Sequence, residues 1–424
     1  MSLVRAKQST QFQRFYWQSA LNLIGNAVAS FLAFLFNFLV VQNVTQADYG
    51  EYSSVMSYVT LLSLPLTVVA LLITKKISAR PESGRRDYLC RLNSRILATL
   101  RSWWWLVVLG LLAIVWWLCQ HANFLYPTSV ILVLVLLVAN CVTTFLSAQI
   151  TGLQWFGVLS LVSVVSMLFR LLGGALALHF AASLASLYVS LGVTMWLQTG
   201  LHVWGLCRRG QTLTSNNRAL PYLWSQLATA RDWWLTLTAV TVTTALLNVD
   251  VITVKMLCPA LLAGQYGLYS LLAKVIVYAS QPLINVAFTF FNSHESVTLK
   301  RRIYWLSVGL IVLFTAGMSL IYRLIPEFLI VYVGTQEYLA LAPILWLAAI
   351  FGGLYCLCML TLQNFLARER AGLFIGLLAP VIQIVGIACW HTSALAVMLV
   401  NIVVVSVLLV VLGLTNLSQG RYVA

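Results

Sequence analysis

Long apolar stretches separated by short polar segments run through the whole chain. Each stretch holds the ~20 residues that a helix needs to cross the hydrocarbon core of a bilayer. Barrel strands would instead show short alternating segments. The apolar stretches predict helices at residues 15–41, 52–74, 102–120, 125–148, 155–179, 182–206, 233–257, 266–291, 303–323, 339–366, 372–391 and 393–414. We therefore predict an all-α polytopic membrane protein with twelve transmembrane helices.

Composition supports this prediction and excludes a soluble protein. Hydrophobic residues make up 61% of the 424 positions and charged residues only 8%, whereas charged residues make up about 25% of a soluble domain. The eight cysteines are scattered along the chain, and the five histidines lie far apart. Neither set has the spacing of a metal site, and no acid–base pair suggests an enzyme. We expect no enzymatic activity, no metal and no cofactor.

The basic residues define the expected orientation in the membrane. Of the 25 Lys and Arg residues, 21 fall in segments that a twelve-helix reading places on one side, together with both termini. The positive-inside rule puts that side in the cytoplasm. Because these residues lie at helix ends, contacts with anionic membrane lipids explain the net charge of +15, and nucleic acid is not an expected partner.

A weak internal repeat divides the predicted helices into two equal sets. Residues 49–53 (Tyr-Gly-Glu-Tyr-Ser) recur at 266–270 (Tyr-Gly-Leu-Tyr-Ser), and the same offset aligns Pro65 with Pro282. The repeated unit holds six helices, an even number, so both copies cross the membrane in the same sense, related by an axis along the membrane normal. We predict two six-helix lobes with a cavity between them. Their bounds are 1–206 and 233–424, joined by a cytoplasmic linker at 207–232.

Polar residues at helical spacing predict which helices face this cavity. They lie in the predicted helices 15–41, 52–74, 233–257 and 266–291, which are corresponding pairs in the repeat. Polar side chains inside an apolar helix must face protein or water. The candidate substrate-binding residues are Asn22, Asn26, Asn248, Tyr278 and Gln281. The alternative is that these side chains only hold helices together, since polar residues also stabilise helix bundles in lipid.

Four basic residues lie outside the cytoplasmic segments, and two of them predict an anion site. Arg170 and Lys274 lie well inside apolar stretches, where a charge costs at least ~2.5 kcal/mol and marks a substrate or ion route. Lys255 and Arg323 lie near the outer interface, so we expect their charged ends to reach water. Asp250 is the only carboxylate expected inside a helix. It either forms a salt bridge with Lys274 or serves in ion coupling.

Several short motifs resemble one branch of a known transporter superfamily. They are Ala-Asp-Tyr-Gly-Glu-Tyr at 47–52, Thr-Gly-Leu-Gln-Trp-Phe at 151–156, Asn-Val-Asp at 248–250 and Gly-Leu-Tyr-Ser at 267–270. In this order, with the repeat, they resemble the polysaccharide-flippase (Wzx-type) branch of the multidrug/oligosaccharidyl-lipid/polysaccharide (MOP) exporter superfamily. The resemblance implies a V-shaped carrier in the bacterial inner membrane whose cavity takes the diphosphate and glycan of an undecaprenyl-linked saccharide. Lys274 and Arg170 would contact the diphosphate or an acidic sugar.

The predicted function is therefore flipping of a lipid-linked oligosaccharide across the cytoplasmic membrane by alternating access. It would serve the biosynthesis of a cell-surface polysaccharide such as the O-antigen of lipopolysaccharide, with other polysaccharide-assembly membrane proteins as partners. One alternative is a cation-coupled multidrug antiporter of the same superfamily, with Asp250 as the proton or sodium site. Another is a membrane subunit of a polysaccharide synthase or export complex, which needs no isolated charges in a cavity.

Overall fold

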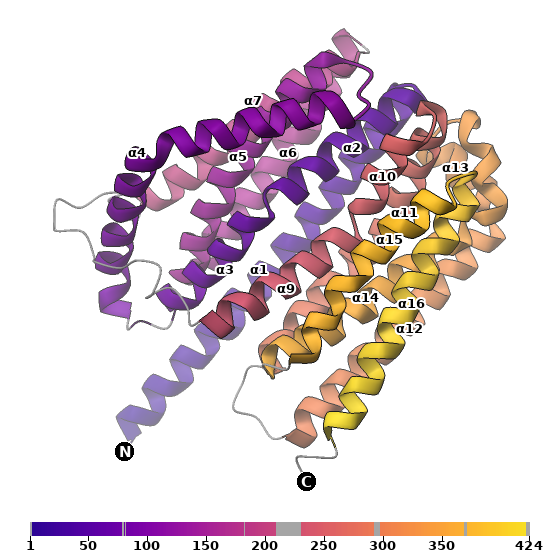
Figure 1. Cartoon of the computed structure of the whole chain (residues 1–424). Helices are drawn as coiled ribbons and strands as arrows, with labels where there is room; N and C mark the ends of the chain where they lie inside the picture. Colours follow the sequence, from indigo (N-terminus) through magenta and orange to yellow (C-terminus); the bar gives the residue numbers. More distant parts are fainter. Residues whose placement is uncertain are drawn as a thin grey trace.

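The computed structural model describes residues 2–78, 80, 82–181, 183–208, 230–291, 297–368 and 371–420 (Figure 1). Within these ranges the regular secondary structure is helical and no strand is present. Ten helices are long and apolar enough to cross a membrane, or up to twelve if each of two bent helix pairs counts as one span. The prediction of an all-α polytopic membrane protein is confirmed.

Seven helices form the first half of the described structure. α6 packs on α1 and α7, while α5 packs on α3 and α7. α4 lies at the edge of this half, and its apolar segment is largely exposed. The seven are α1 (Ser2–Asn43), α2 (Gln46–Leu62), α3 (Leu64–Ser78), α4 (Glu82–His121), α5 (Pro127–Gly152), α6 (Phe156–Phe180) and α7 (Leu184–Arg208).

The second half is organised around α14, which packs on α11, α12 and α16. Its helices are α9 (Ala230–Leu246), α10 (Val249–Leu257), α11 (Ala260–Phe291), α12 (Val297–Leu324), α13 (Pro326–Val333), α14 (Trp346–Ala367), α15 (Leu378–Cys389) and α16 (Ala394–Gly420), with 3₁₀ turns η1 (Gln336–Ile344) and η2 (Ala371–Leu377). Most of the predicted linker, at 209–229, lies outside the described residues. The lobe bounds therefore stay a prediction.

Two of the predicted helices are each broken into a bent pair, so the prediction of continuous helices is wrong there. α2 and α3 meet at an angle of 49°, and α9 and α10 at 47°. The first break is followed by Pro65, which lacks the backbone N–H that a continuing helix needs. At the second break the side-chain amide of Asn248 donates to the carbonyl of Thr244 (2.8 Å), in competition with the backbone ladder.

One helix is longer than predicted. The expected helix at 102–120 is the second part of α4, which begins twenty residues earlier in the chain, at Glu82. A non-helical backbone conformation at Trp103 (φ −112°, ψ 18°) separates the two parts. The first part is amphipathic: Tyr88, Leu89 and Leu92 are buried against α3 and α5, while most of its arginines point outward. The apolar part begins only after this kink, which is why hydropathy alone placed the start there.

The internal repeat appears in the structure as two matched tyrosine pairs. The ring centroids of Tyr49 and Tyr52 lie 5.9 Å apart at 37°, and those of Tyr266 and Tyr269 lie 5.8 Å apart at 33°. All four rings are fully buried. Since α2 and α11 pack on each other, the two repeated segments meet where the halves of the molecule meet.

The halves come into close contact where α2 and α11 begin, at the end of the bundle opposite the last turn of α3, which holds Lys75 (Figure 1). We call this the far end, and the end that holds Lys75 the basic end. A Cβ atom on Gly50 would lie 2.7 Å from the backbone nitrogen of Gly264, and one on Gly264 would overlap the carbonyl oxygen of Gln46. Only glycine permits such an approach of α2 and α11. The two backbones therefore close the space between the halves at this point.

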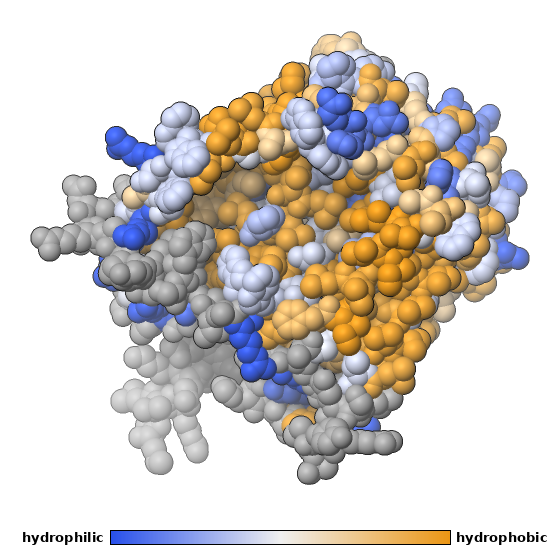
Figure 2. Space-filling model, viewed as in Figure 1, coloured by the Kyte–Doolittle hydropathy of each residue, from blue (hydrophilic) through white to orange (hydrophobic). Residues whose placement is uncertain are grey.

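Apolar side chains cover most of the visible middle of the molecule, and hydrophilic ones gather towards its ends (Figure 2). Many large hydrophobic residues are exposed, among them Trp104, Leu313 and Val403. In water such a surface would cause aggregation, whereas a bilayer covers it. The distribution fits a polytopic membrane protein.

Candidate functional site

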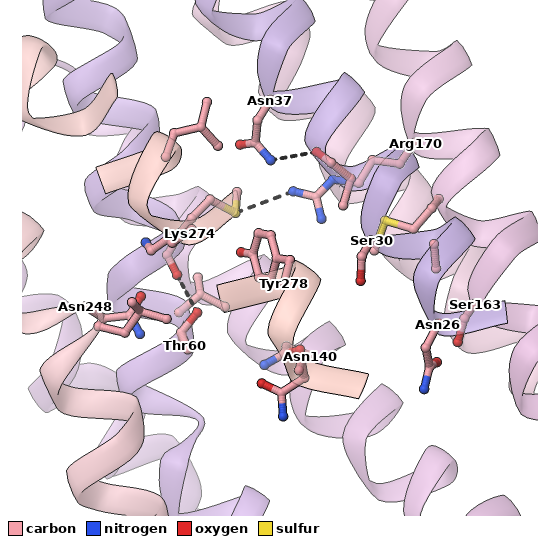
Figure 3. A pocket seen from close by; sticks show the side chains of 18 of the residues that line it. Asn26, Ser30, Asn37, Thr60, Asn140, Ser163, Arg170, Asn248, Lys274 and Tyr278 are labelled. Atoms are coloured by element: carbon pink, nitrogen blue, oxygen red, sulfur yellow. Dashed lines mark hydrogen bonds between the residues drawn. The ribbon is translucent and has the colours of Figure 1, made fainter. Parts of the chain in front are cut away.

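A cavity of about 820 Å³ lies between the two halves, a volume within the ~300–1,000 Å³ of small-molecule sites. Its walls come mainly from α1, α2 and α6 of the first half and from α11 of the second (Figure 3). About half of the lining residues are polar. They include Asn26, Ser30, Asn37, Ser53, Ser57, Thr60, Asn140, Ser163, Arg170, Gln198, Asn248, Lys274, Tyr278, Gln281 and Asn285.

Arg170 is held on the α6 wall by contacts that leave part of its guanidinium free. The group lies over the ring of Phe36, 4.7 Å from the centroid, a cation–π arrangement. Gly174, one turn further along α6, makes room for that ring, since a Cβ there would lie 2.5 Å from a ring carbon. The Nη2 atom contacts the sulfur of Met56 at 3.7 Å.

The guanidinium of Arg170 has donor capacity that the protein does not use. Its Nε atom is buried and has no hydrogen-bond partner within the described structure. No carboxylate forms an ion pair with it in the described ranges. A buried donor without a partner is rare in folded proteins and is normally satisfied by protein, water or ligand. Because Arg170 lines the cavity and has no carboxylate partner in the described structure, it is a candidate for binding an anion there.

Lys274 lies on the opposite wall, on α11. Its side chain is half-buried, and among the described residues its ammonium group forms no hydrogen bond or ion pair. Tyr278 follows four positions later on the same helix face, is 37% exposed and points into the same space (Figure 3). The two cations therefore approach the cavity from different halves of the molecule.

None of the described lining residues is an acid. The polar surface consists of two cations together with amide and hydroxyl groups, which donate and accept hydrogen bonds without carrying charge. This lining attracts an anion and offers many partners to a hydroxyl-rich ligand.

Most of the residues predicted to bind substrate lie together here. Asn26, Asn248, Tyr278 and Gln281 line the cavity with the two cations. Asn22 lies on α1, but its side chain falls outside the described part of the structure. Gln281 donates to Asn285 at 2.9 Å, so some of these polar groups are paired with one another.

Asp250 lies outside this lining, at the start of α10. It is fully buried and accepts hydrogen bonds from the hydroxyl of Tyr266 and from the backbone N–H of Val251. The Lys274 ammonium attracts it electrostatically, but the two groups are farther apart than the 4.0 Å of a salt bridge. Of the two predicted alternatives, the direct salt bridge is absent from the described structure.

The prediction for Lys255 was wrong. Its side chain is 3% exposed, and its ammonium group lies 2.8 Å from the carboxylate of Glu51, which is completely buried. Glu51 also overturns the expectation that Asp250 is the only buried carboxylate. A signal was present in the sequence: Glu51 stands where the repeat has Leu268, and the predicted topology places it on the same side of the membrane as Lys255. Arg323, by contrast, is exposed and lies over the ring of Trp346.

No protein-family profile matches the chain, and its sequence matches no curated protein. Similar solved structures include the lipid II flippase MurJ in an inward closed conformation, with a TM-score of 0.67 and 11% identity over 94% of this chain and 87% of that chain. The eukaryotic MATE transporter AtDTX14 gives 0.65 and 12%, covering 96% of each chain. A MOP superfamily transporter from Pyrococcus furiosus Vc1 gives 0.56 and 13%, covering 95% and 94%.

These likenesses show that the chain has the fold of MOP superfamily transporters, as its motifs and repeat predicted. The same fold serves MATE transporters and a lipid flippase, so the fold alone does not choose a cargo. The choice depends on the site.

Proposed function

We propose that this protein flips an oligosaccharide linked to undecaprenyl diphosphate across the bacterial cytoplasmic membrane, for cell-surface polysaccharide biosynthesis. One observation carries the proposal: the described lining of the cavity contains two cations and no acid. Such a cavity favours an anionic head group and disfavours a cationic drug.

Arg170 and Lys274 suit a diphosphate because they offer different kinds of contact. A guanidinium presents a planar fork of donors that matches phosphate oxygens, while an ammonium acts as a point charge. The Nε of Arg170 already lacks a partner. We expect the diphosphate to bind between these two side chains.

The amide and hydroxyl groups suit a glycan. Asn26, Asn248 and Gln281 can each donate to and accept from sugar hydroxyls. A cavity of about 820 Å³ holds a compact saccharide rather than a long polymer. The lipid tail would stay in the surrounding bilayer, so the protein would not have to move apolar chains through a polar cavity.

Alternating access would proceed with both termini in the cytoplasm, as the positive-inside rule predicts. The basic end is then cytoplasmic and the far end faces outward. The close approach of α2 and α11 at Gly50 and Gly264 lies at the far end and supports loading of the cargo from the cytoplasmic leaflet.

We assign ion coupling to Asp250 rather than substrate binding. It lies outside the cavity in a network of buried hydrogen bonds, and no ion pair neutralises it within the described structure. A carboxylate buried inside a membrane helix is energetically expensive, and such residues usually have a function. Binding of a cation there would act on the cargo site through Lys274, which interacts electrostatically with the carboxylate.

Two rival functions are less well supported. A cation-coupled multidrug antiporter is expected to have an acidic group in its cavity. Here Glu51 forms an ion pair with Lys255, and Asp250 does not line the cavity. A non-transporting subunit of a polysaccharide synthase or export complex would have no reason to keep two cations in a polar cavity, given what such charges cost in a membrane.

The proposal is tested by reconstituting the protein and following the sidedness of a fluorescent undecaprenyl-diphosphate saccharide. We expect Arg170→Ala and Lys274→Ala to slow flipping at least tenfold each. Arg323→Ala is the matched control, because Arg323 is a membrane-helix arginine outside the cavity. Undiminished flipping in both cavity variants would refute the anion site. Dye export driven by a cation gradient, without lipid flipping, would establish the antiporter instead.

A further inference from the structure

α4 is attached to the rest of the first half near each of its ends. At the basic end, the side-chain amides of Asn93 on α4 and Gln149 on α5 bond each other reciprocally, at 2.8 and 3.3 Å, and both residues are buried. Towards the far end, Leu118 is buried and the ring of Trp117 meets that of Tyr58 on α2 edge-on, with centroids 6.1 Å apart. The two attachments fix the position of α4 beside α5.

Between these attachments α4 stands clear of the bundle. Every residue from 100 to 110 is exposed, and such a run covers about three turns and therefore every face of the helix, including the face directed at the bundle. Leu118 is buried on that face, yet Val107 and Trp104, which continue it towards the kink, are 47% and 62% exposed. α4 therefore does not pack on its neighbours over this run.

α5 provides the other wall of the space under α4. Because Gln149 bonds to α4, the face of α5 that carries Gln149 is the one directed at α4. Val138 and Ile131 lie on the same face, at intervals that return to it along a helix, and both are exposed. Figure 2 shows a hollow with hydrophobic side chains below the place that α4 has in Figure 1. We call the space between residues 100–110 and this face of α5 the α4 gap.

The shape of the α4 gap limits what can fill it in a membrane. A helix from a partner protein would have to run through the ~30 Å of the hydrocarbon core, but the attachments of α4 close the gap at both ends. Residues 101–110 rise by ~14 Å at ~1.5 Å per residue, which is close to half of that core. An acyl chain from one leaflet therefore has the right length, whereas a partner helix does not.

A cationic rim marks the basic end of the gap. Arg91, Arg95 and Arg101 precede the kink at Trp103, and their guanidinium groups form no ion pair within the described structure. Asp87, which is exposed, is the acid nearest to them along this part of α4. Guanidinium groups match the geometry of phosphate oxygens, and tryptophan favours the level of the lipid head groups. Basic groups beside a crevice between membrane helices are typical of sites for anionic lipid head groups.

We propose that the α4 gap binds an anionic phospholipid of the cytoplasmic leaflet. Its phosphate would bind Arg95 and Arg101, and one acyl chain would lie between α4 and α5. This lipid would complete the packing of α4 and thereby belong to the folded first half. None of the described residues that line the cavity comes from α4, so the site is separate from the transport site and does not depend on the cargo.

The head group is tested by native mass spectrometry of the full-length protein in a neutral detergent. Phosphatidylglycerol and phosphatidylcholine with identical acyl chains are added at equal concentrations. We expect a phosphatidylglycerol adduct several-fold more abundant than the phosphatidylcholine adduct, and Arg95→Gln/Arg101→Gln should lower it to the phosphatidylcholine level. The matched control is Arg301→Gln/Arg302→Gln, which removes two exposed arginines at the start of α12 and should leave the adduct unchanged.

The acyl chain is tested by filling the gap and leaving the arginines in place. Val138→Trp should reduce the phosphatidylglycerol adduct several-fold, and Val138→Phe, which is easier to accommodate, should reduce it less. Phosphatidylglycerol should raise the Tm of the wild type by several degrees and that of Val138→Trp by less. Val403→Trp is the control, because Val403 on α16 is an exposed valine in the other half. Monomeric elution with the helical circular dichroism of the wild type identifies the folded variants.

Several results would overturn the lipid site. Equal adducts of the two lipids, or equal losses in the two double-arginine variants, would show that the rim of α4 does not select an anion. An adduct that survives both Val138 variants would place the acyl chain elsewhere. Undecaprenyl phosphate that displaces phosphatidylglycerol would make the gap a site for an isoprenoid chain. A dimer that forms when lipid is removed, and that Val138→Trp abolishes, would make it a contact between two copies of the chain.

Discussion

The hydroxyl of Tyr266 on α11 donates a hydrogen bond to the carboxylate of Asp250 on α10, and both side chains are completely buried. Asn401 on α16 donates to the same hydroxyl, and Gln383 on α15 donates to Asn401 at 2.9 Å. A chain of hydrogen bonds that ends at the buried Asp250 carboxylate thereby links four helices of the second half. The network lies beside the break between α9 and α10, so it ties the bent helix to the rest of its half.

Tyr266→Phe should destabilise the protein, because it removes the donor to Asp250 and the acceptor for Asn401 at once. A buried polar group left unsatisfied costs roughly 1–3 kcal/mol. The matched control is Tyr269→Phe, since the Tyr269 hydroxyl is buried without a hydrogen-bond partner in the described structure. Thermal unfolding in detergent should show a lower Tm for Tyr266→Phe alone. Equal Tm values for the two variants would contradict the network.

The same network should make transport by the Tyr266→Phe variant respond differently to ions. If Asp250 serves in ion coupling, loss of its hydrogen bond changes how readily the carboxylate takes up a cation. We expect the dependence of flipping on sodium or proton concentration to shift in Tyr266→Phe and to stay as in the wild type in Tyr269→Phe. An unaltered dependence, with Tm already lowered, would assign the network a structural role only.

The sequence predicted the cavity better than it predicted the ion pairs. Arg170 and Lys274 were predicted because a charge inside an apolar stretch is costly and therefore conspicuous, and for Lys274 the repeat also placed its helix beside the predicted cavity. The prediction that Lys255 reaches water was wrong because the position of a residue along its helix does not show which residue of a neighbouring helix faces it. Its partner Glu51 is 204 positions away in the chain, and only packing of α2 against α10 brings them together.

The helix breaks were equally hard to predict. Pro65 and Pro282 occupy equivalent positions in the repeat, yet Pro65 follows a break and Pro282 lies inside the continuous helix α11. The same residue therefore gives different local structure in the two halves. A proline in an apolar stretch therefore does not by itself predict whether the helix breaks there.

Gly264→Ala should prevent the close approach of α2 and α11 at the far end. The added methyl group would overlap the carbonyl oxygen of Gln46, which is backbone and cannot move aside alone. We expect a lower Tm and greater labelling, by a membrane-impermeant reagent, of a cysteine placed at Ser57, which is buried and lines the cavity. Gly309→Ala is the control, because the space around Gly309 on α12 is open and alanine favours a helix by about 0.5–1 kcal/mol. Labelling that stays at the wild-type level in Gly264→Ala would show that the far end is not sealed there.

Arg170→Lys should retain charge and still impair flipping. Lysine keeps the attraction for an anion but loses the planar fork and the stacking on Phe36, whose ring centroid lies 4.7 Å from the guanidinium carbon. We expect an intermediate rate, above that of Arg170→Ala and several-fold below wild type, in the fluorescent-lipid assay. A rate equal to wild type would mean that only the charge matters, and a rate equal to that of Arg170→Ala would mean that only the geometry does.

Lys255→Met should be far more destabilising than Arg323→Met, although both basic residues lie near the same end of the bundle. Lys255 is the cation for a fully buried carboxylate, and breaking a buried pair from one side costs ~3–5 kcal/mol. Glu51 keeps its bonds from Ser129 and Leu125, so we expect the lower part of that range. Arg323 is exposed and only stacks on Trp346, which is worth about 0.5–1 kcal/mol.

In thermal unfolding, Glu51→Gln/Lys255→Met should recover most of the loss, because no uncompensated charge remains. If the double variant is as unstable as the sum of the single ones, the two residues act independently and are not a coupled pair.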